Sequence, residues 1–500
     1  MSALAALAPR RACVIGAGFG GLALAIRLQA SGVETVLVEA RDKVGGRAYA
    51  IERDGFTFET GPGVFTDPAA LSELWSLSGH DMAADIELLP VSPFWRLNWP
   101  DGAGFDLTGD EASLTREVAR VAPDDLGGLD DFLRYSGAAL AEGYRRLGSV
   151  PFPDFRTAAK ALPALLRQQT WRSLWSIASS QVRDAHLRQA LTFQALLIGA
   201  NPLSTSAVHA LALKLEQDTG VWWPKGGAGK LAEAMATQFQ RLGGTLRLHD
   251  PVVHIHTLGN RATEVETQSG WTERFDAVAS NADVMHTYRE LLAGTQRGAE
   301  MARSLARKRY SPGAFLVHFA LEGSWPGIQH HTMLFGPRYK GLLDDVFEHG
   351  VLPQDQMILL DHPTVTDPSM APAGKSTFRA MVPVAHLGKL PIDWDTIGPM
   401  LEKRVIDEVG RRLIPDIHDR IVTKFHYAPR DFALDYNAYL GSGWGLEPVL
   451  SQTAWLRPHS RDGKIANFYL VGAGAHPGAG VPAVLGSARA AAKLMLEEMK

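Results

Sequence analysis

The residues that most directly suggest chemistry are the glycines of Gly16-Ala17-Gly18-Phe19-Gly20-Gly21 and the carboxylate of Glu39. Gly16 allows a tight turn, Gly18 lets the backbone approach a pyrophosphate, and Gly21 lets a helix pack closely on a strand. Glu39 follows at close to the usual spacing of about 20 residues, where an acid accepts hydrogen bonds from ribose hydroxyls. This pattern predicts a dinucleotide-binding site.

Two apolar strands and one helix must position these residues. Residues 12–15 and 35–38 are short apolar runs, and residues 22–28 have helical composition. The N-terminus of such a helix offers free N–H groups and a partial positive charge to phosphates. Because strand, glycine turn, helix, strand and acid occur in this order, an ordinary glycine turn is the weaker interpretation.

The segment 41–47 narrows the choice of cofactor. Gly45 and Gly46 can present backbone N–H groups, and Arg47 a fixed charge, to the same pyrophosphate from its other side. A nicotinamide enzyme does not need this second contact, and the alternative is a solvated basic loop. These residues resemble the amine-oxidase-like flavoprotein superfamily, in which this segment holds FAD.

The same resemblance implies cofactor contacts farther along the chain. In the superfamily the corner formed here by Gly61-Pro62 lies against the flavin, and Val252 is a candidate backbone contact to adenine. Asn281 follows an apolar strand, at the edge of the sheet where ligands bind in such folds.

The last segment, around Gly474, Gly480, Val481 and Pro482, leads into a helix of small residues expected over 483–499. The N-terminus of this helix offers unpaired N–H groups to an anion. On a flavin its target would be the N1/O2 edge, which becomes negative on reduction. The resemblance therefore implies non-covalent FAD.

Composition limits the function classes. The chain has 500 residues, 46% of them hydrophobic and 21% charged, which is ordinary for a globular protein with a large core. The net charge of −4 argues against a nucleic-acid partner. The one cysteine, Cys13, lies in the first predicted strand, where we expect it to be buried, and it excludes an internal disulfide.

No targeting or spanning segment is expected. Residues 1–8 are small and apolar, but the arginines Arg10 and Arg11 follow them, which reverses the order of a signal peptide. An uninterrupted apolar run of about 18 residues is missing from the sequence. Membrane contact would therefore be peripheral, and we expect a cytoplasmic protein at the inner face of the cell membrane.

The order of the elements predicts a mixed α/β and α+β fold. We expect a Rossmann-like FAD-binding domain of the glutathione-reductase or amine-oxidase type, a second mixed-sheet substrate domain and a helical, membrane-facing cap. The expected limits are 9–80, 219–284 and 455–500 for the FAD-binding domain, 81–109 and 285–454 for the substrate domain, and 110–218 for the cap.

Within the cap, residues 155–200 combine tryptophan and leucine with arginine on amphipathic helices. This combination suits a membrane interface. It equally suits a helical cap whose apolar side lies in the core, and the sequence leaves both interpretations open.

Paired histidines invite a metal hypothesis, which we disfavour. His254 and His256 alternate with apolar residues, as in a strand with one polar face, and His330-His331 is expected in a loop. Neither pair has a third ligand at suitable spacing, so no metal site is predicted.

Several segments resemble the phytoene desaturase family of the bacterial and fungal type. They span nearly the whole chain and comprise 16–47, 222–229, 280–288, 330–339, 362–368, 437–448, 455–459 and 470–487. The resemblance implies FAD, peripheral membrane attachment and phytoene, a long colourless polyene, as the substrate. It also implies quinone or oxygen as the electron acceptor and leaves the oligomeric state open.

The chain departs from this family at two places. Relatives often have an acid directly after the arginine that here is Arg156, where this chain has Thr157, so a proton-removing role for that acid is in doubt. The segment Gly443-Trp444-Gly445 is bulkier and richer in glycine than expected, which could alter the substrate tunnel.

The favoured function is FAD-dependent desaturation of phytoene in successive steps toward neurosporene or lycopene, in carotenoid biosynthesis. The alternatives are a carotenoid isomerase or later-step desaturase on the same fold and, less favoured, a non-enzymatic prenyl-binding protein. Flavin can accept the hydride, so no nucleophile is needed. We assign no catalytic residue: His476 and Glu447 are candidates by position, and a structural role is favoured for both.

Overall fold

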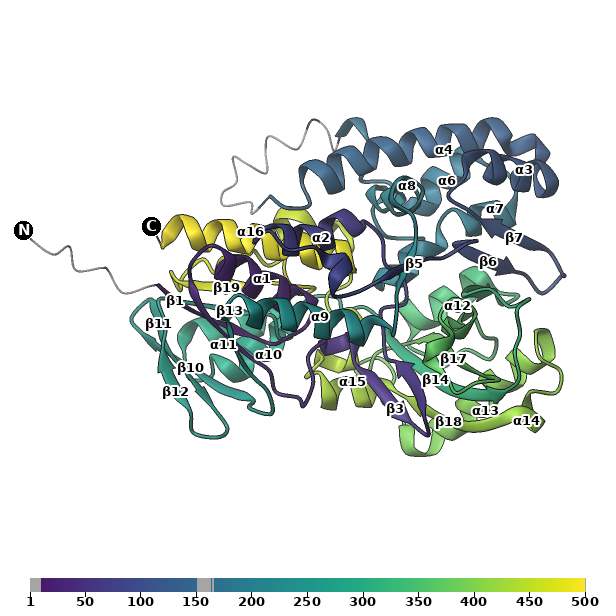
Figure 1. Cartoon of the computed structure of the whole chain (residues 1–500). Helices are drawn as coiled ribbons and strands as arrows, with labels where there is room; N and C mark the ends of the chain where they lie inside the picture. Colours follow the sequence, from purple (N-terminus) through teal and green to yellow (C-terminus); the bar gives the residue numbers. More distant parts are fainter. Residues whose placement is uncertain (1–9, 151–162, 164–165, 500) are drawn as a thin grey trace, which may run out of the picture.

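The computed structural model describes residues 10–150, 163 and 166–499. One large β-sheet lies in each half of the molecule, and helices cover both sheets (Figure 1). The chain passes between the halves several times, so each half is assembled from segments that are distant in sequence. The mixed α/β and α+β fold expected from the sequence is therefore present.

The first large sheet is parallel and has the strand order β19-β13-β1-β2-β9. Its strands are β1 (Arg11–Ile15), β2 (Glu34–Val38), β9 (Thr245–Arg247), β13 (Ala277–Ser280) and β19 (Phe468–Leu470). The three central strands are almost entirely buried, as is typical of a parallel sheet covered on both faces.

The two faces of this sheet pack against different elements because side chains alternate along a strand. Ala12 and Val14 of β1 join a core formed with α1 (Phe19–Ala30), α9 (Ala228–Arg241) and α16 (Val481–Glu498). Cys13 and Ile15 join a second core that includes an antiparallel three-stranded sheet. That sheet consists of β10 (Val252–Leu258), β11 (Arg261–Thr267) and β12 (Thr272–Arg274). Cys13 is thus buried, as predicted.

The second large sheet has seven strands in the order β18-β14-β17-β16-β15-β6-β7, and only the β15–β6 pair is parallel. Helix α13 (Trp394–Arg412) covers one face. The other face is turned toward the helical cap. The strands are β6 (Trp95–Asn98), β7 (Gly104–Leu107), β14 (Gly313–Glu322), β15 (His331–Leu334), β16 (Ile358–Asp361), β17 (Lys375–Val384) and β18 (Ile421–Tyr427).

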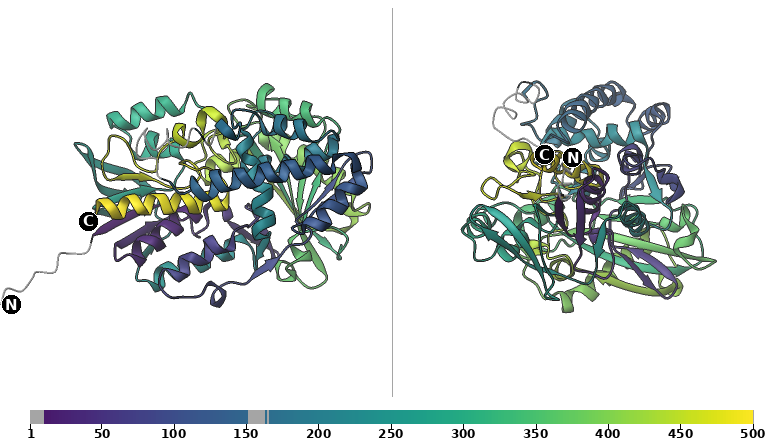
Figure 2. Two further views of the ribbon diagram at one scale, coloured as in Figure 1. Left: turned by 90° about the horizontal axis from the view of Figure 1, so that it is seen from above. Right: turned by 60° about the vertical axis from the view of Figure 1, so that its left-hand side comes forward.

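The cap is helical, as predicted, and lies on the same side of the molecule as α16 (Figures 1 and 2). A π-helix (Leu140–Arg146) continues its longest helix, α4. Its helices are α3 (Glu111–Val121), α4 (Leu126–Ala139), α6 (Leu174–Gln181), α7 (Ala185–Ala190) and α8 (Leu211–Thr219).

Two strand pairs and several short helices complete the fold. The pairs are β3 (Ala50–Arg53) with β4 (Phe56–Glu59), and β5 (Leu88–Pro90) with β8 (Trp222–Pro224). The β5–β8 pair joins segments that we assigned to different domains, so the domain limits remain a proposal. The other helices are α2 (Pro68–Ser76), α10 (Val284–His286), α11 (Gln296–Leu305), α12 (Tyr339–Asp344), α14 (Ile417–Arg420) and α15 (Pro429–Asp435).

In the segment 155–200, some apolar residues fit the interpretation as core and others fit the interpretation as a membrane interface. Leu174 and Ile177 are buried in the core, whereas Leu166 and Trp171 are 52% and 55% exposed. Arg156 and Thr157 lie outside the described residues. Among the residues that the structure describes, no helix combines the length and the apolar character needed to cross a bilayer.

The expected loop at His330-His331 is wrong for its second residue. His331 begins strand β15 and is fully buried. Its ring can be buried because Asp361 of the neighbouring strand accepts a 2.8 Å hydrogen bond from its Nδ1. Across residues 10–150, 163 and 166–499, no cluster of three or more histidine, cysteine or acidic side chains could hold a metal ion.

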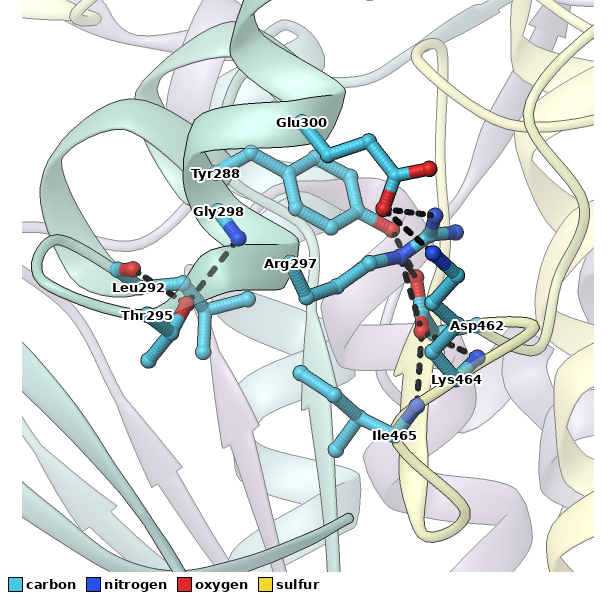
Figure 3. A network of polar contacts seen from close by, with 9 residues as sticks. All are labelled: Tyr288, Leu292, Thr295, Arg297, Gly298, Glu300, Asp462, Lys464 and Ile465. Carbon is cyan, nitrogen blue, oxygen red and sulfur yellow. Dashed lines mark hydrogen bonds and ion pairs between the residues drawn. The ribbon is translucent and has the colours of Figure 1, made fainter. Parts of the chain in front are cut away.

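A buried polar network fastens the segment after β13 to the loop before β19 (Figure 3). The carboxylate of Asp462 is fully buried and accepts hydrogen bonds from the hydroxyl of Tyr288 at 2.7 Å and from Nε of Arg297 at 2.8 Å. The backbone N–H groups of Lys464 and Ile465 also donate to it, each at 2.8 Å. One carboxylate thus satisfies four donors from two distant segments.

We expect Asp462→Ala to lower the free energy of unfolding by about 3 kcal/mol or more, because it leaves a half-buried arginine and several buried donors without their acceptor. Urea unfolding followed by circular dichroism measures this loss. Glu300→Ala is the control, since the exposed carboxylate of Glu300 contacts the same network only through ion pairs with Arg297 and Lys464, and it should leave stability nearly unchanged. An equal loss in both variants would contradict this account of the network.

Candidate nucleotide and substrate site

A single cavity of about 1350 Å³ runs from the glycine turn at the edge of the parallel sheet to the inner face of the seven-stranded sheet. The glycine turn, Glu39 and the start of α16 line one end. Apolar side chains of the cap and of the seven-stranded sheet line the other, among them Leu197, Ile198, Leu316, Leu359 and Met381. A polar cleft thus continues into a largely apolar tunnel.

The glycines of the turn are needed because the side chain of Asn281 fills the space where their Cβ atoms would be. A Cβ on Gly18 would lie 2.9 Å from Nδ2 of Asn281, and one on Gly20 would lie 2.6 Å from its Oδ1. Gly21 has another role: its Cβ would lie 1.9 Å from the carbonyl oxygen of Gly16, so α1 can start against the turn only with glycine there. Backbone is therefore exposed to the cavity where a pyrophosphate needs it.

Glu39 directly follows β2, and its carboxylate binds the backbone of the glycine turn. It is 7% exposed, its Oε2 accepts from the N–H of Ala17 at 2.7 Å, and its Oε1 accepts from the N–H of Arg41 at 3.0 Å. Burial raises the pKa of this carboxyl group, and the two backbone donors oppose the rise. Each oxygen retains a further lone pair for a ribose hydroxyl.

Arg47 supplies a cation without a partner. It lines the cavity, and its guanidinium forms no hydrogen bond or ion pair with the part of the chain that the structure describes, although its backbone carbonyl accepts a 3.0 Å hydrogen bond from the hydroxyl of Thr60. Burial lowers the pKa of its guanidinium, and the nearby carboxylate of Asp283 opposes that shift. A half-buried arginine whose guanidinium faces a glycine-lined cavity without an ion-pair partner fits a dianionic pyrophosphate.

The corner Gly61-Pro62-Gly63 lines the middle of the cavity and is held from behind by an ion pair. Nε of Arg379 donates to Asp361 at 2.9 Å, and its Nη1 donates to the carbonyl of Glu59 at 3.2 Å. A Cβ on Gly63 would lie 2.8 Å from Nη2 of Arg379, so the corner and the guanidinium are in close contact. Burial alone would raise the pKa of Asp361, but Arg379 and His331 lower it below its usual value.

The C-terminal segment reaches the same cavity from another side. Gly474, Gly480, Val481 and Pro482 line it, and Gly480 is the N-cap of α16. Helix α16 is 18 residues long, and its first N–H groups have no partner within the helix.

The structure brings the predicted site residues together. Gly16, Gly18, Glu39, Gly46, Arg47, Gly61, Pro62, Val252, Asn281, Gly474, Gly480, Val481 and Pro482 all line the cavity, and Gly21 lies just behind it. Their individual contacts to a cofactor remain our proposal.

Comparison with known proteins identifies the family. The model of the flavin-containing amine oxidoreductases matches residues 19–496. The chain belongs to this family. Its cofactor is FAD, and the exposed glycine backbone, the unpaired arginine and the free helix N-terminus described above fit that group.

Individual relatives are more specific. The chain is 48% identical to a lycopene-forming phytoene desaturase of Paracoccus sp. (strain N81106 / MBIC 01143), over 98% of both chains. It is 46% identical to the lycopene-forming phytoene desaturase of Pantoea ananas, over 97% of this chain and 99% of that protein. Among solved structures, an oxidoreductase from Methanosarcina mazei has the same fold, with a TM-score of 0.65 and 17% identity over 98% of this chain and 100% of that one.

Sequence reasoning missed three polar residues in the cavity wall. Asp361 and Arg379 are neighbours only through the pairing of β16 with β17, so no local pattern marks them. Glu216 lies in helix α8 of the cap and is buried, which its surroundings in the sequence do not indicate. An acid within an otherwise apolar face of a helix was the only available signal.

The two catalytic candidates named from the sequence have structural contacts. Glu447 does not line the cavity and accepts a 2.7 Å hydrogen bond from Nε of Arg309. His476 lines the cavity, but its Nε2 is 3.0 Å from the carbonyl of Leu147, and burial lowers its pKa to about 4.

We expect Arg47→Met to weaken FAD binding about 10- to 100-fold, because a charge-assisted hydrogen bond contributes about 1.5–3 kcal/mol. Titration of the apoprotein with FAD, followed by flavin fluorescence, gives the dissociation constant. Arg53→Met removes an arginine from exposed strand β3, outside the cavity, and should leave that constant unchanged. Wild-type affinity in Arg47→Met would rule out the pyrophosphate contact.

Proposed function

We propose that this protein is a phytoene desaturase that introduces double bonds in successive steps and forms lycopene. The observation that carries the proposal is the continuity of the nucleotide cleft with an apolar tunnel in one cavity. The lycopene-forming relatives, similar over nearly the full length, support this choice of substrate and product.

The residues at the two ends of the cavity have different roles, one set binding the cofactor and the other the substrate. FAD, when bound, accepts the hydride. The glycine turn and Arg47 would hold its pyrophosphate, and the N-terminus of α16 would favour negative charge on its ring. Leu316, Leu359 and Met381 hold the polyene and exclude water from the reacting carbons.

Product analysis in bacteria that make only phytoene tests this function. Expression of the protein should give coloured lycopene, whose mass is lower than that of phytoene by two hydrogens for each double bond introduced. Unchanged mass with altered geometry would indicate an isomerase. A colourless preparation without FAD would instead favour a prenyl-binding protein.

We further propose that the protein attaches peripherally to the inner face of the cell membrane, where the substrate dissolves and a quinone or oxygen takes the electrons. Leu166 and Trp171 are exposed beside Thr170, which lines the cavity. Leu450 and Leu456, 46% and 54% exposed, also line it.

These two groups of exposed apolar residues belong to neighbouring parts of the cavity wall. Ser206 donates a 2.6 Å hydrogen bond to the carbonyl of Thr170, and Thr205 donates at 2.8 Å to the carbonyl of Pro448. Exposed leucine and tryptophan around one end of an apolar tunnel favour insertion into a lipid surface.

We expect the double substitution Leu166→Ser and Trp171→Ser to reduce binding to phospholipid vesicles about tenfold or more, because the two half-exposed apolar side chains together contribute about 1.5 kcal/mol or more when withdrawn from water. Flotation of protein with vesicles measures the bound fraction. Leu258→Ser removes an even more exposed leucine, 78% accessible, from the three-stranded sheet and should have no effect. Equal effects from both would refute the assignment of the docking face.

A further inference from the structure

Desaturation requires a proton acceptor as well as a hydride acceptor. When hydride leaves one carbon of the polyene, a proton must leave the neighbouring carbon. The titratable groups that line the cavity are therefore candidates. They differ in the hydrogen bonds and ion pairs that they already form.

Most of the carboxylates that line the cavity already have hydrogen-bond or ion-pair partners. Glu39 accepts hydrogen bonds from the backbone N–H groups of Ala17 and Arg41. Asp283 caps α10 through the N–H groups of Met285 and His286. Asp361 is bound to Arg379 and His331, which makes it a weak base.

Glu216 is different. It is 4% exposed and lines the cavity from helix α8. Its Oε2 accepts hydrogen bonds from Nε1 of Trp95 at 3.1 Å and from Nε2 of Gln194 at 2.7 Å. Both donors are neutral, and Oε1 makes no hydrogen bond with any residue that the structure describes. One oxygen is thus anchored and the other remains available.

The contacts of α8 and of Trp95 link Glu216 to the loop after the flavin corner and to the seven-stranded sheet. Thr219, one turn after Glu216, accepts a 3.0 Å hydrogen bond from the N–H of Asp67, which follows the corner Gly61-Pro62-Gly63 closely in sequence. On the other side, the ring of Trp95 lies 4.8 Å from the ring of His331 on the seven-stranded sheet. The residue before Glu216, Leu215, also lines the cavity.

Among the described residues, no cation forms an ion pair with Glu216. Among the elements packed against α8, Arg145 of the π-helix pairs with Asp218, Arg146 pairs with Glu142, and Arg134 of α4 pairs with Asp131. Lys214 of α8 itself also pairs with Asp218. Asp130 of α4 is exposed. His209, which precedes α8, has its pKa lowered by burial.

Burial raises the pKa of Glu216 to about 7, and the hydrogen bonds from Trp95 and Gln194 limit the rise. A base with this pKa exchanges protons readily at neutral pH.

We infer that Glu216 accepts the proton removed from the polyene in each desaturation step. The inference deepens the proposed function and depends on it. One C–H bond breaks with both electrons, and hydride goes to FAD. The adjacent C–H bond loses its proton to Oε1 of Glu216, and its electron pair becomes the second bond of the new C=C. The polyene is oxidised by two electrons, FAD is reduced by two, and the carboxylate becomes a carboxylic acid.

The test measures anaerobic flavin reduction by phytoene in vesicles, as a function of pH. The wild-type rate should rise with pH through a midpoint near 7, because only the ionised carboxylate accepts a proton. Glu216→Gln should bind FAD with the wild-type spectrum but reduce it about 100- to 10,000-fold more slowly, without this pH dependence. Asp218→Asn, on the outer side of the same helix, should behave as wild type.

A second variant separates proton transfer from a merely structural role. Trp95→Phe removes one N–H donor that stabilises the carboxylate, so the midpoint should move upward by about one pH unit. An unshifted midpoint in Trp95→Phe, or a wild-type rate in Glu216→Gln, would overturn the inference. If the wild-type protein with bound FAD forms no coloured polyene, the proposed function itself fails, and the inference fails with it.

Discussion

The site depends on the close contact between the side chain of Asn281 and three glycines, two from the turn after β1 and one from the turn after β19. Cβ atoms on Gly18, Gly20 and Gly472 would lie 2.9, 2.6 and 2.3 Å from its carboxamide atoms. The strands before these residues are adjacent in the parallel sheet, in the order β19-β13-β1. Because the carboxyl ends of parallel strands meet at one edge, the side chain that follows the middle strand can contact the turns after both neighbouring strands. This contact fixes the first glycine turn against the segment that leads to α16.

The nucleotide half could be predicted from the sequence because its signals are local. Strand, glycine turn, helix and acid follow one another within 30 residues, and each has a separate physical reason. The C-terminal helix and the position of Asn281 at the end of a strand could also be recognised. The sequence did not indicate that Asn281 would contact Gly472, since that contact depends on the order of strands in the sheet.

The substrate half was less predictable because its important contacts cross between strands. The expected loop at His331 was based on two adjacent polar residues. The structure instead places Asp361 directly opposite on β16, and this partner makes a buried histidine compatible with a strand. The bulky Trp444 is accommodated in a similar way. It packs on Gly199, where a Cβ would lie 2.9 Å from the indole, and this glycine is 245 residues away.

The register of the seven-stranded sheet explains how charge and hydrocarbon can share one cavity. Cross-strand pairing creates two adjacent rows on the same face, His318-Arg379-Asp361-His331 and Leu316-Met381-Leu359-Met333. In the polar row, Asp361 accepts from Arg379 and His331, and Arg379 also bonds to the carbonyl of Glu59, so the buried charges compensate one another. In the apolar row, Leu316, Leu359 and Met381 line the tunnel without polar groups. The sheet therefore supports the flavin corner without presenting a free base. Glu216, on the cap, has neither an ion-pair partner nor a backbone donor among the described residues.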